Sequence, residues 1–215
     1  MSRSRSKGKL FVISGPSGTG KGTICSAILE RHDIDLSVSM TTRAPREGEQ
    51  HGREYYFTTV EDFRENIEKG NLLEYAVVYE NMYGTPKDAV MRKLERGRNV
   101  ILEIDMQGAL NIKRAMPESI LIYILPPSLK VLRERLAKRG TDSEEVILKR
   151  SEKALSEIRL IGEYDYYVVN DDLETAVREV EAVIIAEGRR VPDKVMPIIR
   201  KYEEESRDLQ QDPAR

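Results

Sequence analysis

A glycine-rich loop directly after the first apolar segment constrains the fold of this chain more than any other feature. Residues 15–23 read Gly-Pro-Ser-Gly-Thr-Gly-Lys-Gly-Thr and follow the apolar run Leu10–Ile13. Glycines let backbone N–H groups turn toward an anion, and the next helix presents its positive N-terminal end to the same point. Lys21 adds an ammonium group. Together, the short strand, the loop and the helix predict a site for a nucleoside triphosphate.

The loop departs from the usual phosphate-loop pattern just after its lysine. That pattern is Gly-x4-Gly-Lys followed by Ser or Thr. Gly15, Gly20 and Lys21 match it, but Gly22 stands at the hydroxyl position and the hydroxyl arrives with Thr23. In related loops this hydroxyl ligates Mg²⁺. We therefore expect the metal to be held mostly by phosphates and water, with Thr23 as a weak, water-mediated ligand.

Composition excludes several classes of protein. The 215 residues are 40% hydrophobic and 33% charged, which is typical of a globular domain with insertions. The net charge of −2 provides no basic field for nucleic acid. No apolar stretch approaches the roughly 18 residues of a membrane helix. Residues 1–8 are expected to form a disordered basic leader without the apolar segment of a secretory signal. We therefore expect a cytoplasmic protein that binds neither nucleic acid nor membranes.

Short apolar segments alternate with helical patterns along the chain. The expected strands cover residues 10–14, 99–104, 119–125 and 166–169. The expected helices cover residues 21–31, 107–116, 128–139 and 172–189. This alternation predicts an α/β fold of the P-loop NTPase type, in which helices flank a parallel sheet.

Two stretches interrupt this alternation. Residues 37–86 are expected to form an insertion that carries a small mixed sheet and a short helix near residues 61–69, capped by Thr59. Residues 138–157 are expected to form a helical lid with a hinge at Gly140. The remaining ranges are a nucleotide-binding core of residues 9–36, 87–137 and 158–203, and a charged tail, residues 204–215, that is expected to fray.

The insertion contains a second cluster of candidate binding residues. Arg43 and Arg46 flank Pro45, and a guanidinium group is suited to bidentate capture of phosphate. Tyr55 and Tyr83 lie within the same insertion. These side chains predict a phosphate pocket in which every partner is a donor. The alternative is a solvated arginine pair beside two packing tyrosines.

Seven motifs in this order resemble the guanylate kinase family. They span roughly residues 8–185 and read Gly15-Pro-Ser-Gly-Thr-Gly-Lys21, Ser39–Arg46, Gly52–Tyr55, Tyr83-Gly-Thr85, Glu103-Ile-Asp105-Met-Gln-Gly108, Arg139-Gly-Thr141 and Val169-Asn-Asp-Asp172. The resemblance implies that the chain transfers the γ-phosphoryl group of ATP to GMP, and to dGMP, with Mg²⁺. It places the enzyme in purine nucleotide metabolism and GMP recycling.

The resemblance also assigns a GMP site. The residues that would hold GMP are Ser39, Arg43, Arg46, Tyr55, Glu74, Tyr83, Thr85 and Asp105. Glu74 would accept hydrogen bonds from guanine N1–H and the 2-amino group, with Ser39 and Thr85 near O6. Opposite adenine the same carboxylate would stay unpaired, at a cost of about 1–3 kcal/mol or more. Without the resemblance, Glu74 reads as a solvent-facing strand residue.

The ATP site and the catalytic groups follow from the same resemblance. The ATP-binding residues would be Gly15, Pro16, Ser17, Gly18, Thr19, Gly20, Lys21, Gly22, Thr23 and Asn170. The catalytic residues would be Lys21, Arg43, Arg139 and Arg150. The attacking GMP phosphate is already anionic, so catalysis would consist mainly of positioning and charge neutralisation.

Two alternative functions remain at this stage. A kinase for another nucleoside monophosphate could use the same Gly-Lys-Gly-Thr loop, although Glu74 and the paired arginines argue against it. An inactive guanylate-kinase-like interaction domain would share the fold without the chemistry. Lys21, Arg139 and Arg150 favour an active enzyme. Self-association is compatible with the sequence, because the helices from Asp172 onward could pack on a partner or on the core.

Overall fold

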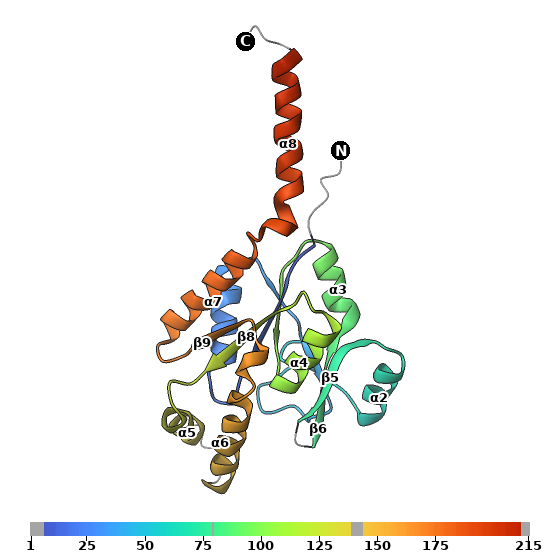
Figure 1. Ribbon diagram of the computed structural model, residues 1–215. Coiled ribbons are helices and arrows are strands. Elements are labelled where there is room, and N and C mark those ends of the chain that lie inside the picture. Colours follow the sequence, from blue (N-terminus) through green and yellow to red (C-terminus); the bar gives the residue numbers. More distant parts are fainter. Residues whose placement is uncertain (1–6, 79, 139–143, 212–215) are drawn as a thin grey trace.

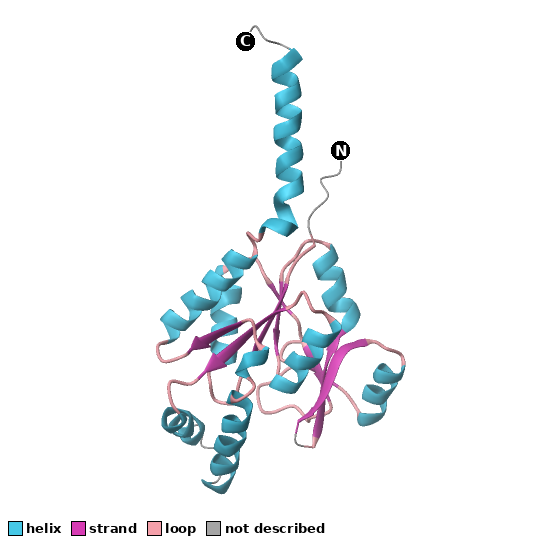
Figure 2. Ribbon diagram, in the orientation of Figure 1, coloured by secondary structure: helices cyan, strands magenta, loops and turns pink. Residues whose placement is uncertain are grey.

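A five-stranded parallel sheet forms the centre of the molecule (Figure 2). The computed structural model describes residues 7–78, 80–138 and 144–211. In spatial order the strands are β2 (Asp35–Leu36), β7 (Val100–Glu103), β1 (Leu10–Ser14), β8 (Ile120–Leu125) and β9 (Tyr166–Val169). The four predicted strands are confirmed to within a residue at either end, and the parallel α/β fold with them. The two-residue edge strand β2 was not predicted.

Helices cover both faces of this sheet because its central strands are apolar on both sides. Phe11 and Ile13 of β1 pack in one apolar cluster with α1 (Lys21–Arg31) and α7 (Leu173–Glu187). Leu10 and Val12 point to the opposite face and pack with α3 (Lys87–Glu95) and α4 (Met106–Ala115). The result is three layers, with the phosphate loop emerging at the carboxyl end of the central strand (Figure 1).

The insertion contains the predicted small mixed sheet. Its strands, in spatial order, are β4 (Tyr55–Phe57), β3 (Ser39–Thr41), β6 (Asn81–Pro86) and β5 (Leu72–Val78). β3 pairs parallel with β4, whereas β6 pairs antiparallel with both of its neighbours. The expected short helix is α2 (Val60–Glu68), and the Thr59 hydroxyl caps it by accepting the Asp62 N–H at 3.1 Å.

Contacts between β5 and α4 join the insertion to the core. In addition, the side-chain amide of Asn111 on α4 donates to the backbone oxygen of Tyr75 on β5 at 3.0 Å. The insertion is therefore held against α4.

The region where the sequence predicts a lid contains most of α6 (Glu144–Ile158), and α5 (Leu129–Lys138) lies just before it. The two helices pack through Leu132, Leu136 and Ala154. A short 3-10 helix, η1 (Ile161–Glu163), then leads back to β9. The predicted hinge Gly140 and the predicted catalytic Arg139 lie outside the described residues.

The last helix, α8 (Val191–Gln211), extends away from the rest of the molecule (Figure 1). Residues 204–211 are helical, where the sequence led us to expect a frayed tail. Several of its apolar side chains are exposed, namely Met196, Ile198, Ile199 and Tyr202. In the described part of the chain α8 adds no side chain to the apolar clusters, so the packed core ends with α7. Over the same residues, no helix is long and apolar enough to cross a membrane.

Candidate active site

A single cleft of about 440 Å³ brings together most of the predicted site residues. It lies between the phosphate loop, the insertion and α6. The predicted residues that line it are Gly15, Ser17, Gly18, Gly20, Lys21, Gly22, Thr23, Ser39, Arg43, Arg46, Tyr55, Glu74, Tyr83, Asp105 and Arg150. Open α/β sheets bind ligands at this carboxyl edge, so the fold supports the location.

The phosphate loop depends on backbone conformations that favour glycine. Gly20 has φ of 88° and forms the N-cap of α1. A side chain at this position would place its Cβ 2.4 Å from Asn170 Nδ2. That amide in turn donates to the backbone oxygen of Thr19 at 2.7 Å. Asn170 is thus buried and hydrogen-bonded to the phosphate loop, and its predicted place near adenine stays a prediction.

Lys21 lies folded against its own loop. Its Nζ donates to the backbone oxygens of Gly15 at 2.6 Å and Pro16 at 3.0 Å. Burial lowers the pKa of Lys21, and the nearby Glu103 carboxylate opposes that shift. The Nζ of Lys21 therefore lies at the cleft wall, bound to backbone oxygens of its own loop.

Two further predicted ATP-binding residues, Pro16 and Thr19, support the phosphate loop from outside the cleft. Thr19 is fully buried, and its hydroxyl donates to the backbone oxygen of Pro16 at 2.9 Å. Neither residue lines the cleft. The hydrogen bond between them lies within the loop and stabilises its shape.

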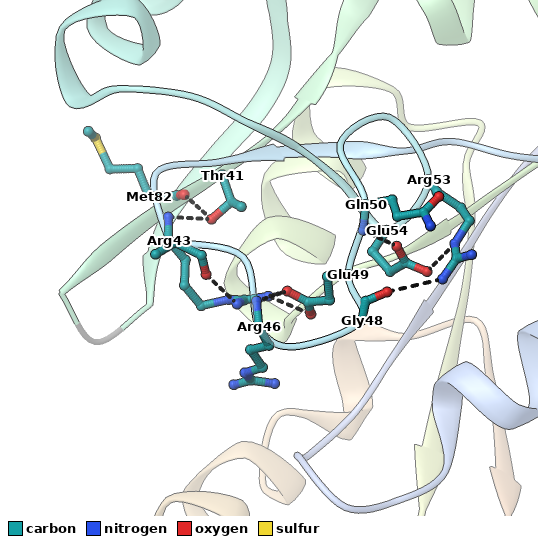
Figure 3. Close-up of polar contacts among 10 residues, drawn as sticks. Thr41, Arg43, Arg46, Gly48, Glu49, Gln50, Arg53, Glu54 and Met82 are labelled. Carbon is teal, nitrogen blue, oxygen red and sulfur yellow. Dashed lines mark hydrogen bonds and ion pairs between the residues drawn. The ribbon is translucent and has the colours of Figure 1, made fainter.

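At the insertion end, Arg43 makes an ion pair that the sequence did not reveal (Figure 3). Its Nη2 donates to both carboxylate oxygens of Glu49, at 2.8 and 2.9 Å, and its Nη1 donates to the backbone oxygen of Ala44 at 2.7 Å. The guanidinium lies over the Tyr55 ring, 5.4 Å from its centroid. The prediction of a pocket lined by donors alone is therefore wrong, because Glu49 also lines the cleft.

The predicted base pocket contains a buried carboxylate. Glu74 is only 7% exposed, and its Oε1 accepts the Thr85 hydroxyl at 2.7 Å. Burial raises its pKa to about 7; the Thr85 hydrogen bond opposes this shift and the nearby Asp105 charge adds to it. Thr85 itself is fully buried behind the cleft wall. Its one described side-chain hydrogen bond is to Glu74.

Gly108 gives the Glu74 side chain its space. A Cβ at Gly108 would lie 2.9 Å from Glu74 Oε2, closer than side-chain carbons approach oxygen. Asp105 begins the same helix and accepts the N–H groups of Gln107 at 2.7 Å and Gly108 at 3.2 Å. Asp105 is thus the N-cap of α4 as well as a residue of the cleft wall.

The α6 side of the cleft carries two residues that the sequence analysis missed. Lys153 and Glu157 line the cleft together with the predicted Arg150. Lys153 Nζ lies 3.8 Å from Glu157 Oε1, so the two form an ion pair. Burial raises the pKa of Glu157. Positions 150, 153 and 157 share one helical face, so the spacing of charges within α6 could have revealed both.

Comparison with known proteins shows the family. The model of the guanylate kinase family matches residues 7–187. The chain belongs to the guanylate kinase family. It is 50% identical over 203 residues to the guanylate kinase of Caldanaerobacter subterraneus subsp. tengcongensis, covering 94% of this chain and 98% of that protein. It is 51% identical over 200 residues to that of Clostridioides difficile, covering 93% and 98%.

A solved guanylate kinase has the same architecture. The crystal structure of guanylate kinase from Anaplasma phagocytophilum matches with a TM-score of 0.75 and 33% identity, over 88% of this chain and 90% of that one. Guanylate kinases phosphorylate GMP with ATP. Membership therefore supports that reaction over phosphorylation of another nucleoside monophosphate and over an inactive interaction domain.

Proposed function

We propose that GMP lies between Glu74 and Arg43 in this cleft, and that ATP lies on the phosphate loop facing it. The observation that carries this proposal is the buried Glu74 carboxylate, whose Oε1 is already paired with Thr85. Guanine N1–H and the 2-amino group are two adjacent donors, and they would satisfy the remaining acceptor capacity. Adenine offers a bare N1 acceptor in their place, so this site should reject AMP.

The phosphate of GMP would be bound by Arg43, Arg46, Tyr55 and Tyr83, which all line the cleft. Ser39 also lines it, and it would lie near guanine O6 with Asp105 on the same side of the base. The GMP phosphate oxygen that attacks ATP is already anionic. The site therefore needs no strong base, and its task is to align two nucleotides and neutralise their charge.

On the ATP side, Lys21 and the loop residues 15–23 would bind the β and γ phosphates. Arg150 of α6 would contact the transferring group from across the cleft, and Arg43 from the acceptor side. Charged contacts that form as the cleft closes would stabilise the transition state more than the separate substrates. Residues 138–157, including Arg139, are proposed as the lid that brings about this closure and excludes water.

Mg²⁺ would accompany ATP. Thr23 and Glu103 line the cleft and provide oxygen atoms, the donor type that Mg²⁺ prefers. Among the described residues no group of three or more acidic, histidine or cysteine side chains is arranged to hold a metal. These residues fit an ion held mostly by phosphate oxygens and water. When bound, the ion neutralises charge on the phosphates.

The direct test is an assay of ADP release from ATP with GMP, dGMP, AMP and UMP as acceptors. We expect rapid turnover with GMP and dGMP and rates lower by orders of magnitude with AMP and UMP. Equal kcat/KM values for GMP and AMP would contradict the assignment of the base pocket. We also propose that the enzyme acts in GMP recycling within the cytoplasm.

A further inference from the structure

Two glutamates in the loop between β3 and β4 have similar bonds but different surroundings (Figure 3). Glu49 accepts the backbone N–H of Arg46 at 2.7 Å and pairs with Arg43. Glu54 accepts the backbone N–H of Gln50 at 2.8 Å and pairs with Arg53 at 2.6 Å. The Arg43–Glu49 side chains are 15% and 17% exposed and line the cleft. The Arg53–Glu54 side chains are 62% and 32% exposed and do not.

Glu49 is connected to both arginines of the proposed phosphate site. It binds the guanidinium of Arg43 through two carboxylate oxygens and fixes the backbone of Arg46 through one of them. The hydrogen bond from Arg43 is the main reason that the pKa of Glu49 is lowered. The carboxylate is therefore charged at neutral pH, and it lies where an anionic ligand is expected.

The Arg43 guanidinium is held by its neighbours at the cleft wall. Arginine carries five N–H donors in a rigid plane. The bonds to Glu49 and Ala44 use Nη1 and Nη2, and the Tyr83 hydroxyl also interacts with the Arg43 side chain. The Tyr55 ring supports one face of the plane. A guanidinium held in this way has a fixed orientation before any phosphate binds.

We propose that Glu49 is a positioning residue for the acceptor phosphate, acting through Arg43 and the Arg46 backbone. The inference rests on the proposed GMP site. Preorganised donors lose less side-chain entropy on binding than donors that must be ordered by the ligand. A carboxylate beside a phosphate also repels it, so the two effects of Glu49 oppose each other. The geometry points to positioning as the larger effect, because this one side chain holds both the Arg43 guanidinium and the Arg46 backbone.

The test measures the affinity of GMP and of guanosine by calorimetry, for the wild-type chain and for Glu49→Gln. Guanosine shares the base but lacks the phosphate, so the ratio of the two affinities reports on the phosphate site alone. We expect Glu49→Gln to weaken GMP binding about tenfold and to leave guanosine binding unchanged. Glu54→Gln, which removes the same charge from the same loop outside the cleft, should change neither affinity.

A second variant separates positioning from charge. Glu49→Asp keeps the charge but shortens the reach to Arg43, so positioning predicts weaker GMP binding for this variant too. Unchanged or tighter GMP binding in both variants would overturn the inference. If the wild-type chain bound GMP no better than guanosine, the proposed phosphate site itself would be wrong. Thermal unfolding of each variant, compared with Glu54→Gln, establishes that the loop change leaves the fold intact.

Discussion

Thr85 donates its hydroxyl to Glu74 at 2.7 Å, across two strands whose register places these residues opposite each other. The contact is thus built into the antiparallel pairing of β5 and β6, since residues directly opposite have neighbouring side chains. It fixes the direction of a carboxylate that is only 7% exposed. Thr85 binds Oε1, and Oε2 lies beside Gly108. In the proposed function, this arrangement discriminates guanine from adenine.

Glu74 should make the ligand-free protein less stable as pH rises. Its pKa is about 7 in the folded chain against an ordinary value of 4.5. Between these values the unfolded chain releases the proton and the folded chain keeps it, so the free energy of unfolding falls as pH increases. The loss is on the order of 3 kcal/mol and is complete above about pH 7.

Denaturant unfolding of the wild-type chain and Glu74→Gln at pH 5 and pH 8 checks this expectation. Glutamine has no proton to release, so the stability of Glu74→Gln relative to wild type should increase between the two pH values. Other titrating groups contribute equally to both proteins and cancel in the difference. A difference that stays constant with pH would show that Glu74 ionises normally in the fold.

Gly108→Ala should separate stability from GMP binding. Alanine favours a helix over glycine by about 1 kcal/mol, and Gly108 lies within α4 with no positive φ. However, its Cβ would meet Glu74 Oε2 at 2.9 Å and displace the carboxylate. We expect a melting temperature equal to or above that of wild type, together with a KM for GMP at least tenfold higher. A variant that retains the wild-type KM would mean that Glu74 does not need this space.

Lys21→Met should abolish most turnover without unfolding the chain. The described hydrogen bonds of Lys21 are to its own loop, so they add little to the packing of distant elements. Loss of one charged group that contacts transferring phosphates costs about 10²–10³ in kcat. Lys130→Met, on the exposed surface of α5, is the matched control and should retain full activity. A kcat within tenfold of the wild-type value would show that Lys21 does not stabilise the transition state.

Features with a local cause could be predicted from the sequence. The helix Lys21–Arg31 was placed to the residue, because the glycine-rich loop fixes where it starts. The cap at Thr59 and the strand Tyr166–Val169 likewise follow from short patterns. The cleft also contains most of the residues implied by the family motifs, since those motifs lie at strand ends that the topology brings together.

Features that depend on tertiary contacts could not be predicted from the sequence. Glu49 has the appearance of an ordinary charged loop residue until the chain folds back and places it on Arg43. The need for Gly108 arises from Glu74, which is 34 positions earlier and reaches it only through the packing of β5 on α4. The contact of Asn170 with the Thr19 backbone oxygen likewise joins residues 151 positions apart, and sequence spacing does not show it.

The most direct test of the account is the ratio of kcat/KM for GMP to that for AMP, measured for the wild-type chain and for Glu74→Ala. The account predicts that the substitution lowers this ratio at least a hundredfold, mainly through loss of GMP turnover, because the acceptor for both guanine donors is gone. Thr85→Val, which leaves the carboxylate in place, should lower it less. A Glu74→Ala enzyme that keeps the wild-type preference for GMP would contradict the central claim.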